Sequence, residues 1–386
     1  MQKARMFGKH EKKMRKQHVL GFLICLCLGL TSFAEVINKD QPIRGEYVLP
    51  VKNAWRIAAA DGEPFGMIRQ IRVSEDGQVI VHDIQAKRFH LFAPDRKFIH
   101  SFGKKGAGPG EIKMMEMAGL FALPGKWVVA DIDQLHFFSL RGDFIYSTPN
   151  HLLRRRPVYF LDESHFLSAP LFRSSPARGD SAIRLINLKN HQTRQLAAFT
   201  PLERPGAGQP GSGRRMAMAF RGVTPMMVVG CDGRRLYYGM NHQYRIHVMD
   251  LSGNHIQTFG IRRDKQGIST EAKKQLISRG GAVRIPAAMQ ERILQRMPDE
   301  ATYFDAIDIH QNLVWVWNSD PGMKNRARVD IFSPQGQYLY RGLIQVEKEY
   351  TILPLPIIRK ANLYLILLDG KGDYMVAKYA VKSPAP

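Results

Sequence analysis

Hydrophobic and polar positions alternate along this chain in short runs that recur as one unit. In the clearest copy, apolar runs at 79–81, 88–92 and 98–102 are separated by a loop and a polar turn. The same order of strand, loop, strand, polar turn and strand recurs over 127–146 and 235–260. A unit of this kind cannot bury its own faces, so it must stack on copies of itself. The pattern predicts an all-β repeat fold.

Six such units predict a six-bladed β-propeller over residues 35–386. They are centred near 66–105, 115–150, 157–200, 223–262, 303–345 and 353–381. The third unit is degenerate. Strand-like pieces at Tyr47–Leu49 and Trp55–Ala58 precede the first unit, so we expect N-terminal strands to complete another blade with C-terminal ones.

One insertion, at about 264–300 between blades four and five, breaks the β pattern. Ser269 and Thr270 form an N-cap signal, and Pro286 opens a second segment with apolar residues on one helical face. This predicts a short helical insertion over one face or the rim of the ring. The sequence favours a plain structural cover over a lid.

Residues 1–34 have the pattern of a secretory signal peptide. A basic stretch to His18 precedes an apolar run of 12 residues, Val19–Leu30, and Ala34 closes the segment. A membrane span needs about 20 apolar residues, so this run is short for one. We expect an exported protein, periplasmic or extracellular, without a transmembrane span in the mature chain.

The charge of the chain favours anionic partners. The full sequence carries a net charge of +22. Residues 1–34 hold seven of its 56 Lys and Arg and one of its 34 Asp and Glu, which leaves +16 on the remainder. Such a charge attracts anions over a long range. For an exported chain we expect a protein or an anionic envelope component rather than nucleic acid, although a generic basic surface without a dedicated ligand is equally compatible.

Cysteine usage and motif content assign no catalytic residue. Two of the three cysteines lie in residues 1–34, so Cys231 remains alone and no intrachain disulfide can form in the remainder. Its apolar surroundings predict a buried strand end. The sequence holds no nucleophile elbow and no zinc motif.

A glycine-rich segment follows the first unit and carries a resemblance to a known family. Residues Gly106–Glu111 read GAGPGE. With this segment, Ile71–Glu111 resembles an NHL-type repeat, and most of 35–386 resembles bacterial exported six-bladed β-propeller proteins with NHL-like blades; Asn38 and Pro42 look like the start of that family's mature chain. The resemblance implies the fold and little about chemistry.

The glycines of this segment have a structural explanation. A linker between blades must turn sharply in a crowded space, which glycine permits. No Gly-Lys-Ser/Thr closes the segment, so it is not a phosphate-binding P-loop. A second glycine-rich stretch, Pro205–Gly213, is either a loop or an anion-binding element.

Polar residues follow the second strand of most units and are the first candidates for a site. They are Asp83, Asp131 with Asp133, Asn241 with His242, Asn318 with Asp320, and Asp369 with Asp373. Equivalent positions in successive blades return to one face, so these side chains could hold a cation such as Ca²⁺. Lactonase-type six-bladed propellers place Glu, Asn and Asp at such a channel, but neither Glu63 nor Glu75 matches their Glu convincingly. Asp and Asn at strand ends also make turns with their own backbone, so metal binding stays unknown and no cofactor is evident.

Arginines are the second group of candidates. Arg154, Arg155 and Arg156 open the third unit, and their guanidinium groups suit carboxylates and phosphates. Three adjacent arginines on a loop are more often a solvated charge run than a dedicated site. Trp315 and Trp317 fit core packing better than sugar stacking.

Three functions follow from these patterns. The favoured one is an exported, non-enzymatic binding or interaction propeller with a ligand or partner on one face, an anionic partner being preferred. The alternative is a divalent-metal-dependent lactonase or lyase acting in the central channel. The third is a structural subunit of an envelope assembly.

Overall fold

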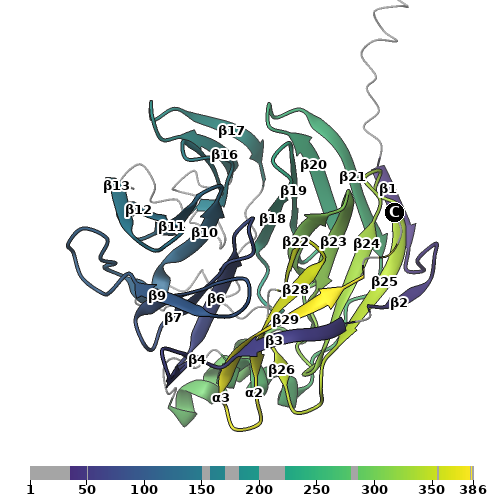
Figure 1. Ribbon diagram of the computed structural model, residues 1–386. Coiled ribbons are helices and arrows are strands. Elements are labelled where there is room, and N and C mark those ends of the chain that lie inside the picture. The colour runs from purple at the N-terminus through teal and green to yellow at the C-terminus, as the bar shows by residue number, and fades with distance from the viewer. Residues whose placement is uncertain are drawn as a thin grey trace, which may run out of the picture. The chain divides into compact units, whose positions relative to one another are not determined.

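The fold is a six-bladed β-propeller, as the sequence predicts (Figure 1). The computed structural model describes residues 35–49, 51–149, 157–169, 182–199, 222–279, 286–353, 356–382 and 384. The predicted signal peptide at 1–34, the Pro205–Gly213 stretch and Arg154–Arg156 lie outside the described residues. The NHL-like character of the blades stays a prediction.

Blades one to three are four-stranded antiparallel sheets that follow one another in the sequence. Blade one contains β6 (Ile68–Val73), β7 (Val79–Asp83), β8 (Arg88–Phe92) and β9 (Phe98–Phe102). Blade two follows the 3-10 turn η1 (Met115–Met117) and contains β10 (Gly119–Leu123), β11 (Lys126–Ala130), β12 (Gln134–Ser139) and β13 (Phe144–Pro149). Blade three contains β14 (Pro157–Phe160), β15 (His165–Ser168), β16 (Ala182–Asn187) and β17 (Thr193–Ala198).

Blades four to six also take strands from the N-terminal segment. Blade four contains β18 (Met227–Cys231), β19 (Arg235–Met240), β20 (Arg245–Asp250) and β21 (His255–Arg262), with β1 (Glu35–Lys39) beside β21. Blade five contains β22 (Phe304–His310), β23 (Leu313–Asn318), β24 (Arg326–Phe332) and β25 (Tyr338–Gln345), with β2 (Glu46–Val48) beside β25. Blade six contains β26 (Thr351–Ile352), β27 (Ile357–Arg359), β28 (Asn362–Leu368), β29 (Tyr374–Val381) and β3 (Val51–Ile57).

The innermost strands close a ring around the propeller axis. Each of β6, β10, β14, β18, β22 and β27 contacts the next, and β27 contacts β6. The second strands behind them are the most buried, because neighbouring blades cover both of their faces; all five residues of β7 are buried. Fully burying one large apolar side chain stabilises a fold by about 1.5–3 kcal/mol, so the repeated apolar strands account for the stacking of the blades.

Strand β3 closes the ring by completing blade six. It pairs antiparallel with β29, from Val381 opposite Val51 to Val376 opposite Ile57. This confirms the expectation that the segment around Trp55 joins the C-terminal strands. The segment around Tyr47 instead forms β2, which adds a parallel fifth strand to blade five. The short hairpin β4 (Ala59–Ala60) and β5 (Glu63–Pro64) then leads into blade one.

Residues 35–49 form a strap along the outer edges of blades four and five. The Asn38 side chain fastens it between the two blades. Its Nδ2 donates to the carbonyls of Gly260 and Gly336, each at 2.9 Å, and its Oδ1 accepts from the Tyr338 N–H at 3.0 Å. Further along, Asp40 pairs with Arg263 at 2.7 Å.

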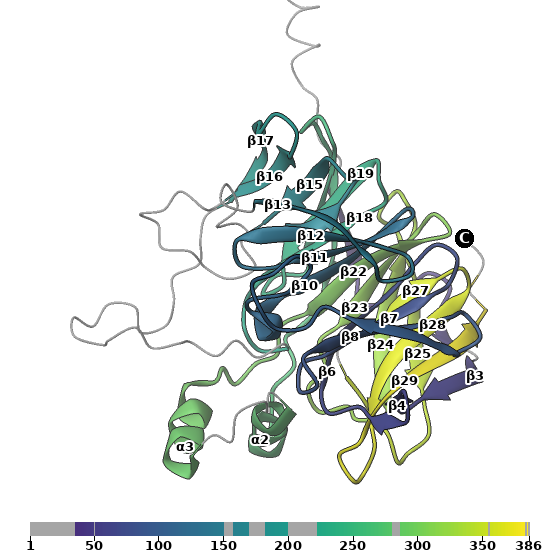
Figure 2. The same cartoon turned by 60° about the vertical axis from the view of Figure 1, so that its left-hand side comes forward.

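The helical insertion lies between β21 and β22, as predicted (Figure 2). Helix α2 (Thr270–Arg279) and helix α3 (Ala287–Arg296) pack through a small apolar cluster around Ile277 and Met297. Thr302 N–H donates to the Gly222 carbonyl at 2.8 Å, which ties the insertion to the end of the ring where the inner strands begin. No helix in the described ranges is long and apolar enough to cross a membrane.

Candidate functional site

The polar residues predicted after the second strands lie where the inner strands begin. Asp83 is opposite Ile68, the first residue of β6, and Asn318 is opposite Phe304, the first residue of β22. Asp131 follows Ala130, which is opposite the first residue of β10. Successive blades therefore return these residues to the same end of the ring.

The Asp83 carboxylate accepts hydrogen bonds from the backbone of its own blade and of the segment that enters it. It accepts N–H groups from Gly66 at 2.7 Å, Met67 at 3.1 Å, and Gln85 and Ala86 at 3.0 Å each. The residue is only 1% exposed. A buried carboxylate with four donors fixes the entry to β6 and the turn after β7, which is the turn-making role of such residues.

Asp131 has the equivalent arrangement in blade two. It accepts the N–H groups of Lys113 at 2.6 Å, Met114 at 3.1 Å and Ile132 at 2.7 Å. Its neighbour Asp133 forms an ion pair with the Lys113 side chain. The carboxylates in blades one and two thus face backbone donors.

The candidates of blade four behave similarly. Asn241 is fully buried and accepts the Met226 N–H at 2.8 Å, immediately before β18. Burial lowers the pKa of His242, with a further contribution from Lys265. A neutral imidazole at this point adds no positive charge to the ring.

In blades five and six the candidates lie in separate environments. Asn318 ends β23, and Asp320 forms an ion pair with Arg328 on β24. Asp369 accepts N–H groups from Lys371 at 2.8 Å and Asp373 at 2.9 Å in an exposed turn. In the part of the chain that the structure describes, no group of three or more His, Cys, Asp or Glu side chains could hold a metal ion.

Cys231 has the predicted position at the end of β18. It is 9% exposed, and burial raises the pKa of its thiol to about 11. A thiol that stays protonated is a poor nucleophile.

A different set of polar residues gathers at the other end of the inner strands. We call it the axial cluster: Arg72 on β6, Tyr159 on β14, Asp308 on β22 and Arg359 on β27. Each lies in the C-terminal half of its inner strand. Because the inner strands close a ring, these positions meet around the axis.

Asp308 is the central group of the axial cluster. The Nε1–H of Trp317, a buried indole that needs an acceptor, donates to its Oδ2 at 2.9 Å. Burial raises the pKa of Asp308 to about 6, although the Trp317 hydrogen bond and the charges of Arg72 and Arg359 act in the opposite direction. Asp308 therefore changes its charge near neutral pH.

Electrostatic interactions in the cluster cross the ring. Burial raises the pKa of Tyr159 to about 12, and Arg359, three blades away in sequence order, works against this rise. Blades three and six are opposite each other in a six-membered ring, so only groups close to the axis can interact in this way. The cluster therefore combines residues of blades one, three, five and six that lie within electrostatic range of one another.

The two arginines of the cluster differ in exposure. Arg72 is half-buried, lies over the Phe121 ring at 6.0 Å and donates to the Ile71 carbonyl at 2.8 Å. Arg359 is exposed, and no hydrogen bond or ion pair reaches its side chain from the described residues. With Asp308 ionised, the two guanidinium groups leave a net positive charge, which suits a carboxylate or a phosphate.

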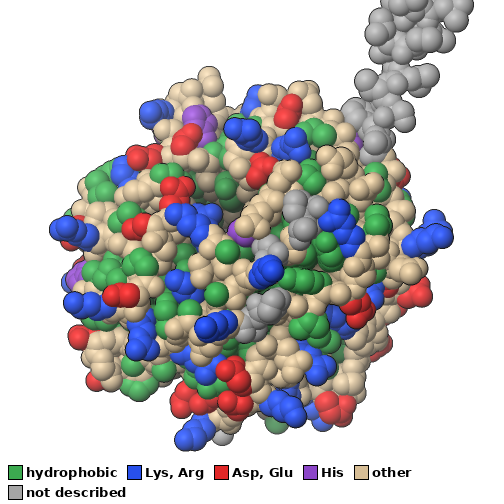
Figure 3. Space-filling view, turned by 45° about the vertical axis from the view of Figure 1, so that its right-hand side comes forward, with side chains coloured by type: hydrophobic (Ala, Val, Ile, Leu, Met, Phe, Trp, Pro, Cys, Tyr) green, Lys and Arg blue, Asp and Glu red, His purple; other side chains and the backbone are tan. Residues whose placement is uncertain are grey.

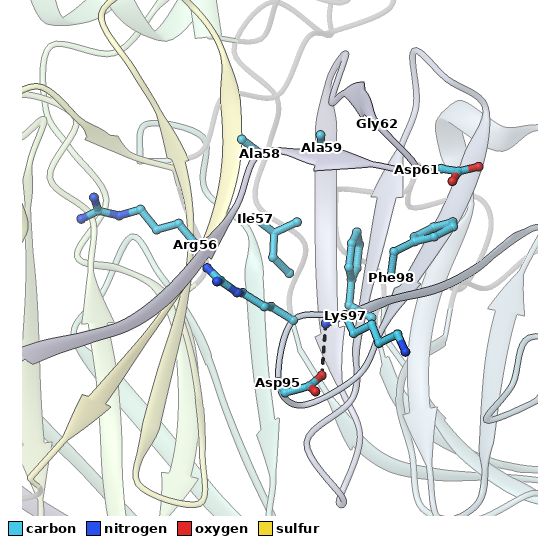
Figure 4. Close-up of a pocket in the computed structure, with 11 residues that line it drawn as sticks. Arg56, Ile57, Ala58, Ala59, Asp61, Gly62, Asp95, Lys97 and Phe98 are labelled. Carbon is cyan, nitrogen blue, oxygen red and sulfur yellow. Dashed lines mark hydrogen bonds between the residues drawn. The ribbon is translucent and has the colours of Figure 1, made fainter.

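A cavity of about 620 Å³ lies elsewhere, between β3 of blade six and the β8–β9 turn of blade one (Figure 4). Arg56, Arg96 and Lys97 line it together with Asp61 and Asp95. Figure 4 shows the Arg56 and Lys97 side chains pointing away from each other. Arg56 also forms an ion pair with Glu347. Arg56 and Lys97 do not converge on a ligand, so the axial cluster is the better candidate.

On the face that Figure 3 shows, the basic residues are spread out rather than gathered in one patch. Figure 3 shows Lys and Arg side chains spread across the visible face, with Asp and Glu among them. This face therefore defines no binding site by its charge alone.

Comparisons with known proteins show the fold. No family model matches the chain, and no curated protein matches its sequence. A member of the DUF4221 family from Bacteroides vulgatus is similar in structure, with a TM-score of 0.54, 11% identity, and coverage of 87% of this chain and 99% of that one. A protein of Bacteroides fragilis named as exported gives a TM-score of 0.51 and 10% identity, with 91% and 100% coverage.

A virginiamycin B lyase from Staphylococcus aureus is more distant, with a TM-score of 0.41, 11% identity, and coverage of 87% of this chain and 100% of that one. At this similarity it carries no argument about chemistry. The structural likenesses establish a β-propeller and leave the ligand open.

Proposed function

We propose that this chain is an exported binding protein that takes a carboxylate or phosphate group of an envelope component at the axial cluster. The observation that carries the proposal is the convergence of Arg72 and Arg359, from neighbouring blades, on one end of the inner-strand ring. The exposed guanidinium of Arg359 provides a bidentate donor pair for an oxyanion.

The remaining features support the same proposal. The net charge of +16 outside residues 1–34 draws anions toward the molecule. Similarity to a protein named as exported agrees with a signal peptide at 1–34. The helices α2 and α3 are tied to the opposite end of the inner strands, so they leave the axial cluster accessible.

Calorimetric titration of residues 35–386 with inorganic phosphate and with glucuronate tests this function. Arg359→Gln should weaken binding by tenfold or more, since one charge-assisted contact contributes about 1.5–3 kcal/mol. Arg96→Gln, in the cavity of Figure 4, is the matched control and should bind as the wild type does. Affinity should also fall with added salt. Equal affinities for the Arg359 variant and the wild type would show that the anion binds elsewhere.

The alternative of a divalent-metal-dependent lactonase or lyase has its own test. Elemental analysis of the purified chain after dialysis without chelator would show a stoichiometric ion if the alternative holds. Within the described ranges, no observation favours it over anion binding.

A further inference from the structure

The outer edges of this propeller accept additional strands. In blades four and five, β1 and β2 of the strap lie beside the outermost strands β21 and β25. Blades one, two and three end in β9, β13 and β17, which have no neighbour beyond them among the described residues. A free strand edge presents unpaired N–H and C=O groups that can pair with another strand.

The edge of blade two is the apolar one. Three consecutive large side chains on β13 are exposed: Phe144 at 37%, Ile145 at 45% and Tyr146 at 38%. The edge of blade one has a single such residue, Ile99, and β17 of blade three begins with exposed polar residues. Edge strands are normally protected by charge or by a covering element, so the edge of β13 is an unusual feature.

The aromatic side chains of β13 are held in place from behind. Tyr146 stacks on Phe137 of β12 with ring centroids 4.5 Å apart, and Phe144 packs edge-on against Phe138 at 5.9 Å. Such fixed rings lose little conformational entropy when a partner covers them. The exposed strand is therefore a preformed surface.

Among the described residues, two ion pairs lie beside this edge. Lys126 lies near the Tyr146 ring and pairs with Glu163 at 2.6 Å, while Lys113 pairs with Asp133. In a chain with a net charge of +16 outside residues 1–34, two copies repel each other over most of their surface. An apolar edge whose described neighbouring lysines are paired is where such copies can approach.

We propose that β13 pairs antiparallel with β13 of a second copy of this chain, which joins two propellers through their blade-two edges. An antiparallel strand pair about a two-fold axis is self-complementary, so one edge serves both partners. Pro149 lacks an N–H and ends the pairing. The contact is narrower than the roughly 1,200–2,000 Å² of a standard interface, so the dimer dissociates on dilution. It leaves the axial cluster of each propeller open and does not depend on the proposed function.

Sedimentation velocity of residues 35–386 over a wide concentration range tests the dimer. The wild type should shift from monomer to dimer as its concentration rises. Ile145→Lys should raise the dissociation constant at least tenfold, since it places a charge on the paired edge. The side chain is exposed in the monomer, so the variant should keep the wild-type circular dichroism spectrum. Ile99→Lys on β9 is the matched control and should dimerise normally.

A covalent readout makes the result independent of folding stability. Cys231 is buried, and the other two cysteines lie in residues 1–34, so Ile145→Cys introduces the one accessible thiol among the described residues. Mild oxidation should convert this variant to a disulfide-linked dimer, whereas Ile99→Cys should stay monomeric. A wild type that is monomeric at every concentration, or an Ile145→Lys variant that dimerises like the wild type, would overturn the proposal.

Discussion

Asp308 is a buried carboxyl group whose ionisation affects the stability of the folded chain. Its pKa is about 6 in the folded protein against an ordinary value of 3.8. Below the ordinary value the carboxyl group is neutral in both states. Between the two values the unfolded chain releases the proton while the folded chain keeps it, so the folded state loses stability as the pH rises.

We expect this loss to reach about 1–3 kcal/mol between about pH 4 and pH 6.5, after a discount for the partial exposure of the side chain. Asp308→Asn removes the titration and keeps the shape of the side chain. The free energy of unfolding in urea, measured for both proteins across this range, should therefore fall for the wild type relative to the variant. Parallel curves for the two proteins would show that Asp308 titrates normally.

The sequence predicts a shared location only for polar residues that occupy the same place in each repeat. Residues at unrelated places in the repeat meet at the axis only because the ring closes. Asp83 and Asp131 share one place in the repeat, so their common end of the ring was predictable. The backbone N–H groups that donate to these two carboxylates were not predictable, because they belong to the linker that enters each blade. Arg72, Tyr159, Asp308 and Arg359 occupy no common motif, and only ring closure brings them together. The axial cluster was therefore missed.

At the scale of elements, the strands of the strap could not be predicted from the hydrophobic pattern. The blades were predictable because each has several apolar runs in a fixed order. Strands β1 and β2 have five and three residues and a mixed burial pattern, so periodicity alone cannot define them. Their pairing depends on the free edges of β21 and β25, which are more than 200 residues away in the sequence.

The strap should depend strongly on Asn38, which contacts blades four and five at once. Asn38→Ala removes three hydrogen bonds and leaves the carbonyl groups of Gly260 and Gly336 and the N–H group of Tyr338 without this partner. We expect a loss of about 1–3 kcal/mol in the free energy of unfolding and faster hydrogen exchange in β1 and β2.

Asn362→Ala is the matched control for this element. The Asn362 side chain makes one exposed bond to the Lys360 carbonyl at 2.8 Å, so its loss should change stability by less than about 0.5 kcal/mol. If exchange in β1 and β2 were as slow in the Asn38 variant as in the wild type, other contacts of the strap would be sufficient to hold it.

At the scale of the whole molecule, the N-terminal segment has two parts with different roles. Strand β3 closes the ring, and the strap of residues 35–49 lies on the outer edges of blades four and five. Strand β3 supplies the outermost strand of blade six and buries Trp55 and Ile57 at 8% and 7% exposure. The strap lies on blades that are already four-stranded. Closure should therefore be essential to the fold, and the strap should only add stability.

A circular permutant separates the two roles. Val381 lies opposite Val51 in the register of β29 and β3, so a short Gly/Ser linker can join Lys382 to Val51. The new ends fit between Asp61 and Gly62, in the exposed turn of the β4–β5 hairpin. This permutant keeps β3 and omits residues 1–50 and 383–386. It should fold and unfold in one cooperative transition, at a lower urea concentration than residues 35–386. The linear chain that starts at Ala58 lacks β3 and leaves the β29 edge of blade six uncovered, so it should lose the cooperative transition. The reverse result, an intact truncated chain beside an unfolded permutant, would mean that the strap rather than β3 holds the ring closed.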